Sequence, residues 1–367
     1  MVLGALGLGA ALGFVLQRGR FCVTNAMRDV WVNGSTRWLT AFLLAIATQA
    51  VLVQVLLATG AIQVSIPQIA WAAVIGGSFL FGIGIVLAGG CATGTYYRSG
   101  EGLIGSWIAL VFYALLASVM KFGALKPFNE AATGAQSSLS SIPDSLGISA
   151  WVLVATLVAL TAVLVRRERA HVRPLAQPAA RRRGVAHVLF EKAWSPFATA
   201  AVVGALAALA YPLSGWLAGK NSGLGITTPS ANIVQFLTTG DTSVLGWGVF
   251  LVLGIIPGSY IAAKGSGEFR LRAPDARTAV RAVAGGSIMG VGAALAGGCT
   301  IGNSLVQTAR FSYQGWVAFL FTFLGVGFAA RVFVQTHRRA GAGATLVTPA
   351  GAGGVGAGVP ALVRVTP

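Results

Sequence analysis

Three cysteines stand in stretches where glycine interrupts an otherwise apolar sequence. Cys91 and Cys299 lie in two copies of one motif, which reads FGIGIVLAGGCATG at 81–94 and MGVGAALAGGCTIG at 289–302. Eight of the fourteen aligned positions are identical. Cys22 lies in GRFCVTNAM at 19–27, and GLGITTPSA at 223–231 takes the corresponding place before the second copy. The chain is therefore duplicated in sequence, and each half carries two glycine-rich interruptions.

A thiol in such a place has a limited chemical repertoire. A neutral S–H group is a weak hydrogen-bond donor with a polarisable surface, whereas a thiolate would repel an anion. If a short helix begins directly after Cys91, its free N–H groups point back at the cysteine with a partial positive charge. This combination suits a soft anion that binds loosely and leaves again. The small and polar neighbours of the three cysteines complete the candidate path, whose members are Cys22, Thr24, Asn25, Gly90, Cys91, Thr93, Gly94, Thr227, Thr228, Gly298, Cys299, Thr300, Gly302 and Asn303.

A buried cysteine is more often a small packing residue than a functional one. Here all three cysteines occupy the glycine-broken stretches and none lies in an uninterrupted apolar stretch, which favours the functional interpretation. The cysteines form no CxxC pair, and the three histidines fall in polar stretches. A metal site or a disulfide framework therefore has little support, and we expect no cofactor.

The composition is that of a membrane protein. The 367 residues are 55% apolar and only 10% charged, with a mean hydropathy of +0.77, whereas a soluble domain carries about 25% charged residues. The sequence therefore predicts an all-α integral membrane protein with about nine transmembrane helices. The apolar stretches that predict them are 2–17, 38–59, 69–90, 103–122, 148–165, 195–218, 247–263, 279–298 and 314–334.

The basic residues predict the orientation. With the N-terminus outside and nine spans, all but four of the 26 Lys and Arg residues fall on the cytoplasmic side, together with the C-terminus. The four exceptions are Lys121, Lys126, Lys220 and Arg310. The net charge of +17 is thus interpreted as a cytoplasmic face that meets anionic lipid of the bilayer, and nucleic-acid binding is disfavoured.

This topology turns the duplication into an inverted repeat. The apolar stretch before Cys91 runs inward and the one before Cys299 runs outward, so the spans form a 4 + 1 + 4 arrangement with short re-entrant Gly/Cys elements. We predict a first membrane repeat at 1–122 and a second, inverted repeat at 194–337. Between them, 123–193 holds an outer loop with one surface turn, a connecting helix and a basic cytoplasmic loop at 166–192. Residues 338–367 form a Gly/Ala-rich tail that is predicted to be disordered.

The nine acidic residues all fall at the ends of apolar stretches or between them. No apolar stretch holds a carboxylate or histidine for a proton relay or a cation site, which favours an anion or a neutral solute. Arg98 and Arg310 follow the two motifs and could meet an anion, although Arg98 is equally a charge that sets topology. Tyr96 and Tyr97 could gate the path, but anchoring at the membrane interface is the favoured interpretation.

At these residues the chain resembles the YeeE/YedE family of bacterial inner-membrane sulfur transporters. The match consists of GRFC at 19–22, GGCxxG at 89–94 and GGCxxG at 297–302, and the resemblance extends over about residues 1–335. It implies thiosulfate uptake through an hourglass-shaped protein in the bacterial inner membrane, with S–H groups contacting the ion and no covalent chemistry. It also implies Cys299 as the outer station, Cys91 as the central one and Cys22 as the inner one. A small cytosolic TusA-like sulfur carrier is the partner that the resemblance implies.

Two other interpretations stay open from the sequence. One is a transporter or channel for another small anion or for a selenium compound, with the thiols incidental. The other is a membrane sulfurtransferase in which a cysteine forms a persulfide, although no base accompanies the three separate cysteines. The sequence favours a transporter over an enzyme.

Overall fold

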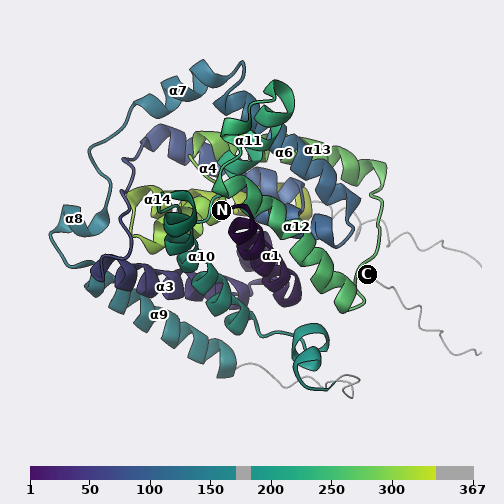
Figure 1. The fold of residues 1–367 in the computed structure, drawn as a ribbon, viewed down its shortest axis with the longest axis horizontal. Coiled ribbons are helices and arrows are strands. Elements are labelled where there is room, and N and C mark those ends of the chain that lie inside the picture. The colour runs from purple at the N-terminus through teal and green to yellow at the C-terminus, as the bar shows by residue number, and fades with distance from the viewer. Residues whose placement is uncertain (171–182, 336–367) are drawn as a thin grey trace, which may run out of the picture.

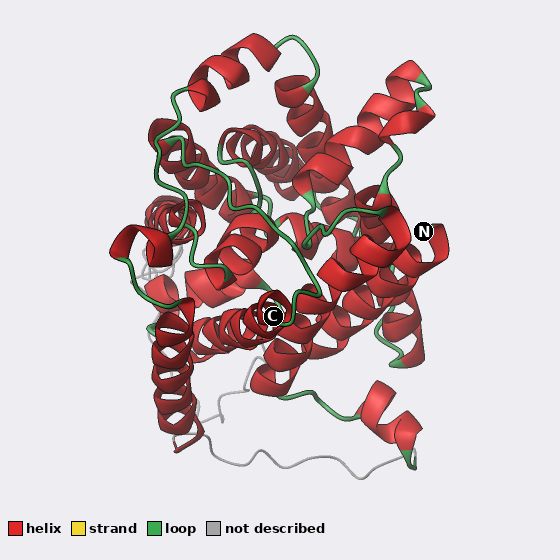
Figure 2. Cartoon of the chain, turned by 60° about the vertical axis from the view of Figure 1, so that its left-hand side comes forward, coloured by secondary structure: helices red, strands yellow, loops and turns green. Residues whose placement is uncertain are grey.

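The computed structural model describes residues 1–170 and 183–335, and its regular structure is helical throughout these residues (Figures 1 and 2). Within them, nine helical segments are long and apolar enough to cross a membrane. The predicted all-α membrane fold with about nine spans is thereby confirmed. The predicted tail at 338–367 and the middle of the predicted basic loop lie outside the described residues.

The first half of the chain folds as six helices, of which α2 and α5 are short. Two of the nine spans are composite, because α1 continues into α2 and α4 continues into α5 after a break. The bounds are α1 Val2–Gly19, α2 Val23–Asn33, α3 Arg37–Ala58, α4 Trp71–Leu87, α5 Ala92–Gly100 and α6 Ile104–Lys121.

The second half repeats this order after a connecting region. The connecting region holds α7 Lys126–Gly134, α8 Ile142–Leu146, α9 Ala150–Ala170 and η1 His187–Glu191. The second half comprises α10 Pro196–Ala218, α11 Thr227–Thr239, η2 Thr242–Val244, α12 Trp247–Gly265, α13 Ala276–Leu295, η3 Thr300–Gln307, α14 Tyr313–Ala329 and η4 Ala330–Gln335. Helices α1, α3, α4 and α6 thus correspond to α10, α12, α13 and α14.

The packing of the helices follows this correspondence. Helix α1 of the first half packs on α12 of the second half. The helices that correspond to them, α10 and α3, also pack on each other. Helix α6 packs on α13 and α14 packs on α4, while α4 contacts its own counterpart α13. Helix α9 has no counterpart and packs along α3 at the edge of the bundle (Figure 1). The two halves therefore contact each other through pairs that are exchanged by the duplication, as a 4 + 1 + 4 arrangement requires.

Glycines let the central helices α4 and α13 approach backbone to backbone. A Cβ atom added at Gly77 would lie 2.5 Å from the backbone nitrogen of Ala296, and one at Gly292 would lie 2.5 Å from that of Phe81. A Cβ atom at Gly84 would lie 2.6 Å from the nitrogen of Met289. Close packing through small residues is the main attraction between helices in a membrane, where lipid removes the hydrophobic driving force. The many glycines thus hold together the helices that end at Cys91 and Cys299.

The prediction for residues 123–147 was wrong in one respect. This stretch forms two short helices, α7 and α8, where the sequence analysis expected a loop with one surface turn. Pro127 and Pro143 occupy the first turn of α7 and α8, where a missing N–H group costs nothing. The prolines that were interpreted as loop signals therefore start the helices.

Candidate functional site

Four short helices begin directly at the predicted interruptions. Cys22 is the N-cap of α2, Cys91 the N-cap of α5 and Cys299 the N-cap of η3, while Ile226 takes the same place before α11. A helix N-terminus leaves N–H groups without intrahelical partners and carries a partial positive charge. Each cysteine sulfur therefore lies where an anion is electrostatically favoured.

The two repeated motifs break their long helices in the same way. Gly89 follows α4 with φ 71° and Gly297 follows α13 with φ 74°. This left-handed conformation costs a residue with a side chain about 1–2 kcal/mol, and glycine adopts it freely. The chain then extends through Cys91 or Cys299 and enters the next helix. The Gly-Gly-Cys sequence is thus a helix break followed by an N-cap.

Different side chains fasten the two breaks. In the first half the Nη1 of Arg98 donates to the carbonyl of Gly89. In the second half the Nδ2 of Asn303 donates to the carbonyls of Ala296, at 2.8 Å, and Gly298, at 3.1 Å. Arg98 and Asn303 thus satisfy carbonyl groups that the helix breaks leave without backbone partners.

Cys22 and Cys91 form a pair although they lie 69 residues apart in the sequence. Both are buried, and their thiols are close enough to interact. The backbone nitrogen of Gly94 donates to the Sγ of Cys91 at 3.4 Å. A Cβ atom at Gly94 would lie 3.5 Å from the Sγ of Cys91 and 3.8 Å from that of Cys22. Gly94 therefore leaves both sulfurs accessible to each other and to a small group beside them.

Buried hydroxyl groups without partners accompany the thiols. Thr24 is in the first turn of α2, Thr93 in that of α5 and Thr300 in that of η3, and each is at most 3% exposed. Their Oγ1 atoms have no hydrogen-bond partner within the described residues. Such an orphaned buried group costs about 1–3 kcal/mol, so a ligand that accepts these hydrogen bonds recovers that free energy. Three of the predicted path residues are thus positioned to donate to an anion.

Cys299 lies in a second polar cluster. The hydroxyl of Tyr113 donates to the Oγ1 of Thr227 at 2.9 Å, and the side chain of Thr227 lies beside Cys299. Ser230 donates to the carbonyl of Ile226 at 2.7 Å. The hydroxyl of Tyr96, at 2.9 Å from Ser230, is therefore the donor in that pair. The cluster joins α5, α6, α11 and η3, so it brings together elements from both halves.

The groups around the three thiols are mainly weak hydrogen-bond donors and acceptors. All three cysteines are free, and the groups that contact their sulfurs are another thiol, hydroxyls and backbone amides. Among residues 1–170 and 183–335, no group of three His, Cys, Asp or Glu residues is arranged to hold a metal ion. The arrangement can therefore bind an anion through weak donors.

A cavity of about 330 Å³ opens beside the η3 element. We call it the Arg310 pocket, and it is lined by Tyr211, Gly302, Asn303, Gln307 and Arg310, among others. Arg310 donates to the carbonyl of Ser65 at 2.5 Å. A Cβ atom at Gly302 would meet nothing within 4 Å, so the helix that Cys299 caps faces open space at this point.

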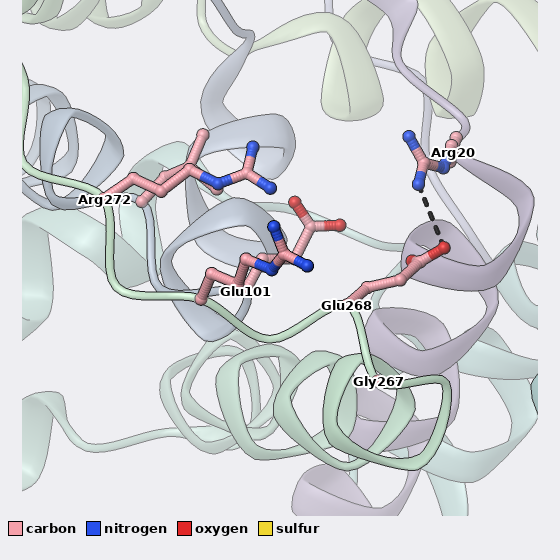
Figure 3. Close-up of a pocket in the computed structure, with 7 residues that line it drawn as sticks. Arg20, Glu101, Gly267, Glu268 and Arg272 are labelled. Atoms are coloured by element: carbon pink, nitrogen blue, oxygen red, sulfur yellow. Dashed lines mark hydrogen bonds and ion pairs between the residues drawn. The ribbon is translucent and has the colours of Figure 1, made fainter.

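A second cavity, of about 230 Å³, opens at the C-terminal ends of α1 and α5. We call it the Arg20 pocket, and Arg20, Glu101, Glu268, Arg270 and Arg272 line it (Figure 3). Arg20 lies two residues before Cys22, and Glu101 directly follows α5, the helix that Cys91 caps. The Arg20 pocket thus lies at the far end of α5 from the thiols. Each pocket lies next to one cysteine-capped element, and the Arg310 pocket carries one guanidinium group whereas the Arg20 pocket carries three.

Comparison with known proteins decides the family. The family model described as sulphur transport matches residues 18–328. The chain belongs to this sulphur transport family. Among its curated relatives, the Escherichia coli protein named thiosulfate transporter TsuA is 48% identical over 342 residues, which cover 93% of this chain and 97% of that protein.

Two further relatives extend the comparison. The Spirochaeta thermophila protein named thiosulfate transporter TsuA is 32% identical over 340 residues, covering 89% of this chain and 97% of the relative. The Escherichia coli protein named probable transporter YedE is 41% identical over 107 residues, which are 28% of this chain and 25% of that protein. The resemblance to YeeE/YedE proteins noted from the cysteine motifs is thereby confirmed, and the chain is a multi-pass membrane transporter of this family.

In this member of the sulphur transport family, Tyr96 and Tyr97 are not anchors at the membrane interface. Both side chains are 3% exposed, which corrects the interpretation from the sequence. They lie on α5, a helix that enters the bundle, so they are buried in protein where the sequence analysis expected them to face lipid headgroups. Tyr113 and Ser230 were missed because each sits in an ordinary-looking apolar or polar stretch with no local signal.

The remaining predicted residues take different places. Asn25 is half-buried, and its backbone N–H group points at Cys22. Gly90 and Gly298 are packed against the fastening side chains, because a Cβ atom there would lie 3.3 Å from the Nη1 of Arg98 and 3.1 Å from the Oδ1 of Asn303, respectively. Thr228 is exposed and accepts a hydrogen bond from Lys121 at 2.7 Å, so its hydroxyl already has a partner.

The pKa values of the two carboxyl groups in the Arg20 pocket are shifted in opposite directions. Burial raises the pKa of Glu268, but the hydrogen bond from Arg20 and the charges of Arg20 and Arg18 outweigh burial and leave the pKa below its ordinary value. Burial also raises the pKa of Glu101, and there Arg98 and Arg20 compensate only in part, so the pKa stays above its ordinary value. Glu268 is thus a stable carboxylate, and the ionised form of Glu101 is disfavoured.

This difference predicts a pH-dependent effect of Glu101→Gln on stability. The folded protein raises the pKa of Glu101, so the protonated carboxyl is favoured in the folded state. The contribution of Glu101 to the free energy of unfolding is therefore fully present at low pH and is lost as the pH rises and the carboxyl ionises. We expect Glu101→Gln to raise the unfolding temperature of the detergent-purified protein at pH 8. The gain should vanish as the pH falls below the ordinary Glu pKa of about 4.3. An unfolding temperature lowered at pH 8 would contradict this account.

Proposed function

We propose that this chain carries thiosulfate inward across the bacterial inner membrane. The observation that carries the proposal is the convergence of the buried Cys22–Cys91 thiol pair with partnerless hydroxyls at the N-termini of three short helices. Two relatives that match nearly their whole length bear the name thiosulfate transporter, which supplies the substrate. The resemblance of the motifs to YeeE/YedE proteins supports the same substrate.

In the proposed transport mechanism, the ion is held by several weak hydrogen-bond donors. Thiosulfate is a small dianion with a polarisable terminal sulfur, so S–H groups and helix N-termini can attract it. The guanidinium of Arg98, which interacts electrostatically with Cys22, adds a positive charge beside the thiol pair. Thr93 and Thr300 donate to its oxygens, while Cys22 and Cys91 contact it through their thiols. Since each interaction is weak, the ion is held long enough to pass and is then released. No bond to sulfur forms or breaks, so a persulfide on any cysteine would count against the proposal.

The direction of the path rests on the positive-inside rule. With the N-terminus outside and the C-terminus inside, the Arg310 pocket is the outer entrance and the Arg20 pocket is the inner end. The ion then passes Cys299 first, Cys91 next and Cys22 last. At the inner end a TusA-like carrier receives it, a partner that the family resemblance suggests.

Uptake of sulfur-labelled thiosulfate by cells that lack other sulfur importers tests the function. Cells that express this chain should accumulate label, and unlabelled sulfate should compete much more weakly than unlabelled thiosulfate. Equal competition by sulfate would replace thiosulfate with a broader class of small anions. Accumulation of labelled selenium compounds in its place would overturn the substrate assignment while leaving a transporter.

The Arg310 pocket predicts that Arg310→Gln changes the KM for thiosulfate uptake more than the maximal rate. Arg310 is the basic residue that lines this pocket, so losing its charge should weaken capture of a dianion and raise the KM for uptake by about 5-fold or more, since a unit-charge interaction at 4 Å in water is about 1 kcal/mol. The maximal rate should change little. Lys220→Gln removes an exposed charge assigned to the same side and serves as the control. Equal KM values for both variants and wild type would exclude Arg310 from capture.

A further inference from the structure

The Arg20 pocket has more positive than negative charge, yet one of its arginines is paired with one of its own glutamates. Three arginines and two glutamates line it. Arg20 pairs with Glu268 at 3.0 Å, and this is the interaction drawn across the pocket in Figure 3. Gln17 also donates to Glu268 at 2.7 Å, and Arg18 lies 3.9 Å from it. The carboxylate of Glu268 thus interacts with Gln17, Arg18 and Arg20 together.

Backbone hydrogen bonds fix the frame of this pocket. The nitrogen of Arg270 donates to the carbonyl of Glu101 at 3.2 Å, and that of Arg272 donates to the carbonyl of Gly102 at 3.0 Å. Gly102 has φ 93°, and a Cβ atom there would lie 2.6 Å from the carbonyl oxygen of Arg270. The loop after α12 is therefore clamped to the turn after α5. Because this backbone is fixed, only the side chains of the pocket are free to rearrange.

The side chain of Arg20 can leave its partner without disturbing the core. It is 72% exposed, and that of Glu268 is 33% exposed. An ion pair with one exposed and one partly exposed partner contributes little to stability, because solvent screens it. The pair is therefore weak enough for a dianion to displace the carboxylate.

We propose that the Arg20 pocket is a second anion-binding site, at the inner end of the path, and that Glu268 occupies its guanidinium group when no anion is present. If Glu268 turns away, three guanidinium groups and the carboxyl of Glu101 remain, so an excess of positive charge faces the incoming dianion. The ion replaces the carboxylate on Arg20, and the return of Glu268 helps to release it. The inward direction rests on the proposed function, whereas the site itself rests on the geometry of the pocket.

The competing explanation is that Arg20 and Glu268 form a structural ion pair only. In that case both single variants, Arg20→Gln and Glu268→Gln, are impaired to the same degree, and combining them restores uptake. If the pocket binds the anion, Arg20→Gln lowers uptake strongly, and Arg20→Gln/Glu268→Gln remains as impaired as Arg20→Gln. These two patterns exclude each other.

Chemical protection measures binding at the site directly. Phenylglyoxal modifies accessible arginines, and mass spectrometry of the purified protein reports the extent at Arg20, Arg270 and Arg272. We expect thiosulfate to slow modification of Arg20. In Glu268→Gln the protecting concentration should fall by up to about 6-fold, because an ion pair this open to solvent leaves its site free at least about 15% of the time. Lys264→Gln, which lies outside the pocket at the end of α12, is the control and should leave the protecting concentration unchanged.

The outcomes separate this proposal from the proposed function. Thiosulfate uptake by wild type with no protection of Arg20 at any concentration would overturn the anion site and leave the transporter. Protection of Arg20 by thiosulfate in a protein that takes up none would support the site and overturn the proposed function. An unchanged protecting concentration in Glu268→Gln would overturn the role of Glu268 as the internal competitor.

Discussion

Replacing Cys91 with alanine is expected to reduce thiosulfate uptake by about 10- to 100-fold, the factor that corresponds to losing a hydrogen bond to a charged group. Cys91 caps α5, faces Cys22 and lies beside Thr300, so it contacts elements from both halves of the chain. The change removes one sulfur atom and should cost little stability. Uptake of labelled thiosulfate at matched membrane expression is the measurement.

A matched control separates the path from general packing. Thr161→Ala changes an equally buried side chain on α9, which packs along α3 away from the thiols, and should leave uptake near wild type. Cys91→Ser retains a hydroxyl donor but loses the polarisable sulfur. Full uptake by both Cys91→Ala and Cys91→Ser would exclude the thiol mechanism and leave the cysteines as packing residues.

The second large effect is expected from Gly77→Ala, a change that adds a single carbon atom. The new Cβ would lie 2.5 Å from the backbone nitrogen of Ala296 and 2.7 Å from the carbonyl oxygen of Gly292. Backbone atoms cannot move aside as a flexible side chain can, so α4 and α13 must separate. Overpacking of this kind typically costs about 1–3 kcal/mol. We expect a lower unfolding temperature and a lower yield of folded protein in detergent.

The neighbouring residue supplies the control for this prediction. Gly76 lies on the exposed side of the same helix, and a Cβ atom there would meet nothing within 4 Å. Gly76→Ala should therefore keep or slightly raise the unfolding temperature, since alanine is favoured over glycine in a helix by about 1 kcal/mol. Equal effects of the two substitutions would refute close backbone contact between α4 and α13.

The short helices that follow the glycine-rich breaks could be predicted because their signals are local. A Gly-Gly pair ends an apolar helix, and a short polar stretch follows Cys91 and Cys299, so the break and the new N-terminus are both visible in the sequence. The duplication added the correspondence between halves, and the packing of α1 with α12 and α3 with α10 follows it. The number of spans followed from hydropathy alone.

What could not be predicted depends on contacts between distant parts of the chain. The meeting of Cys22 with Cys91, and of Arg20 with Glu268 some 248 residues later, is set by the packing of helices and leaves no trace in local periodicity. Tyr96 looked like an interface residue because its neighbours are polar, yet α5 buries it against α11. Proline, a frequent loop signal, began α7 and α8 because it occupied their first turns.

The most direct test of the central claim is uptake by the purified chain alone, reconstituted in liposomes. The account predicts that these liposomes accumulate sulfur-labelled thiosulfate faster than protein-free liposomes, and that Cys91→Ala abolishes most of the difference. Equal accumulation with and without the wild-type protein, in vesicles shown to contain folded protein, would contradict the claim that this chain itself forms the path for thiosulfate.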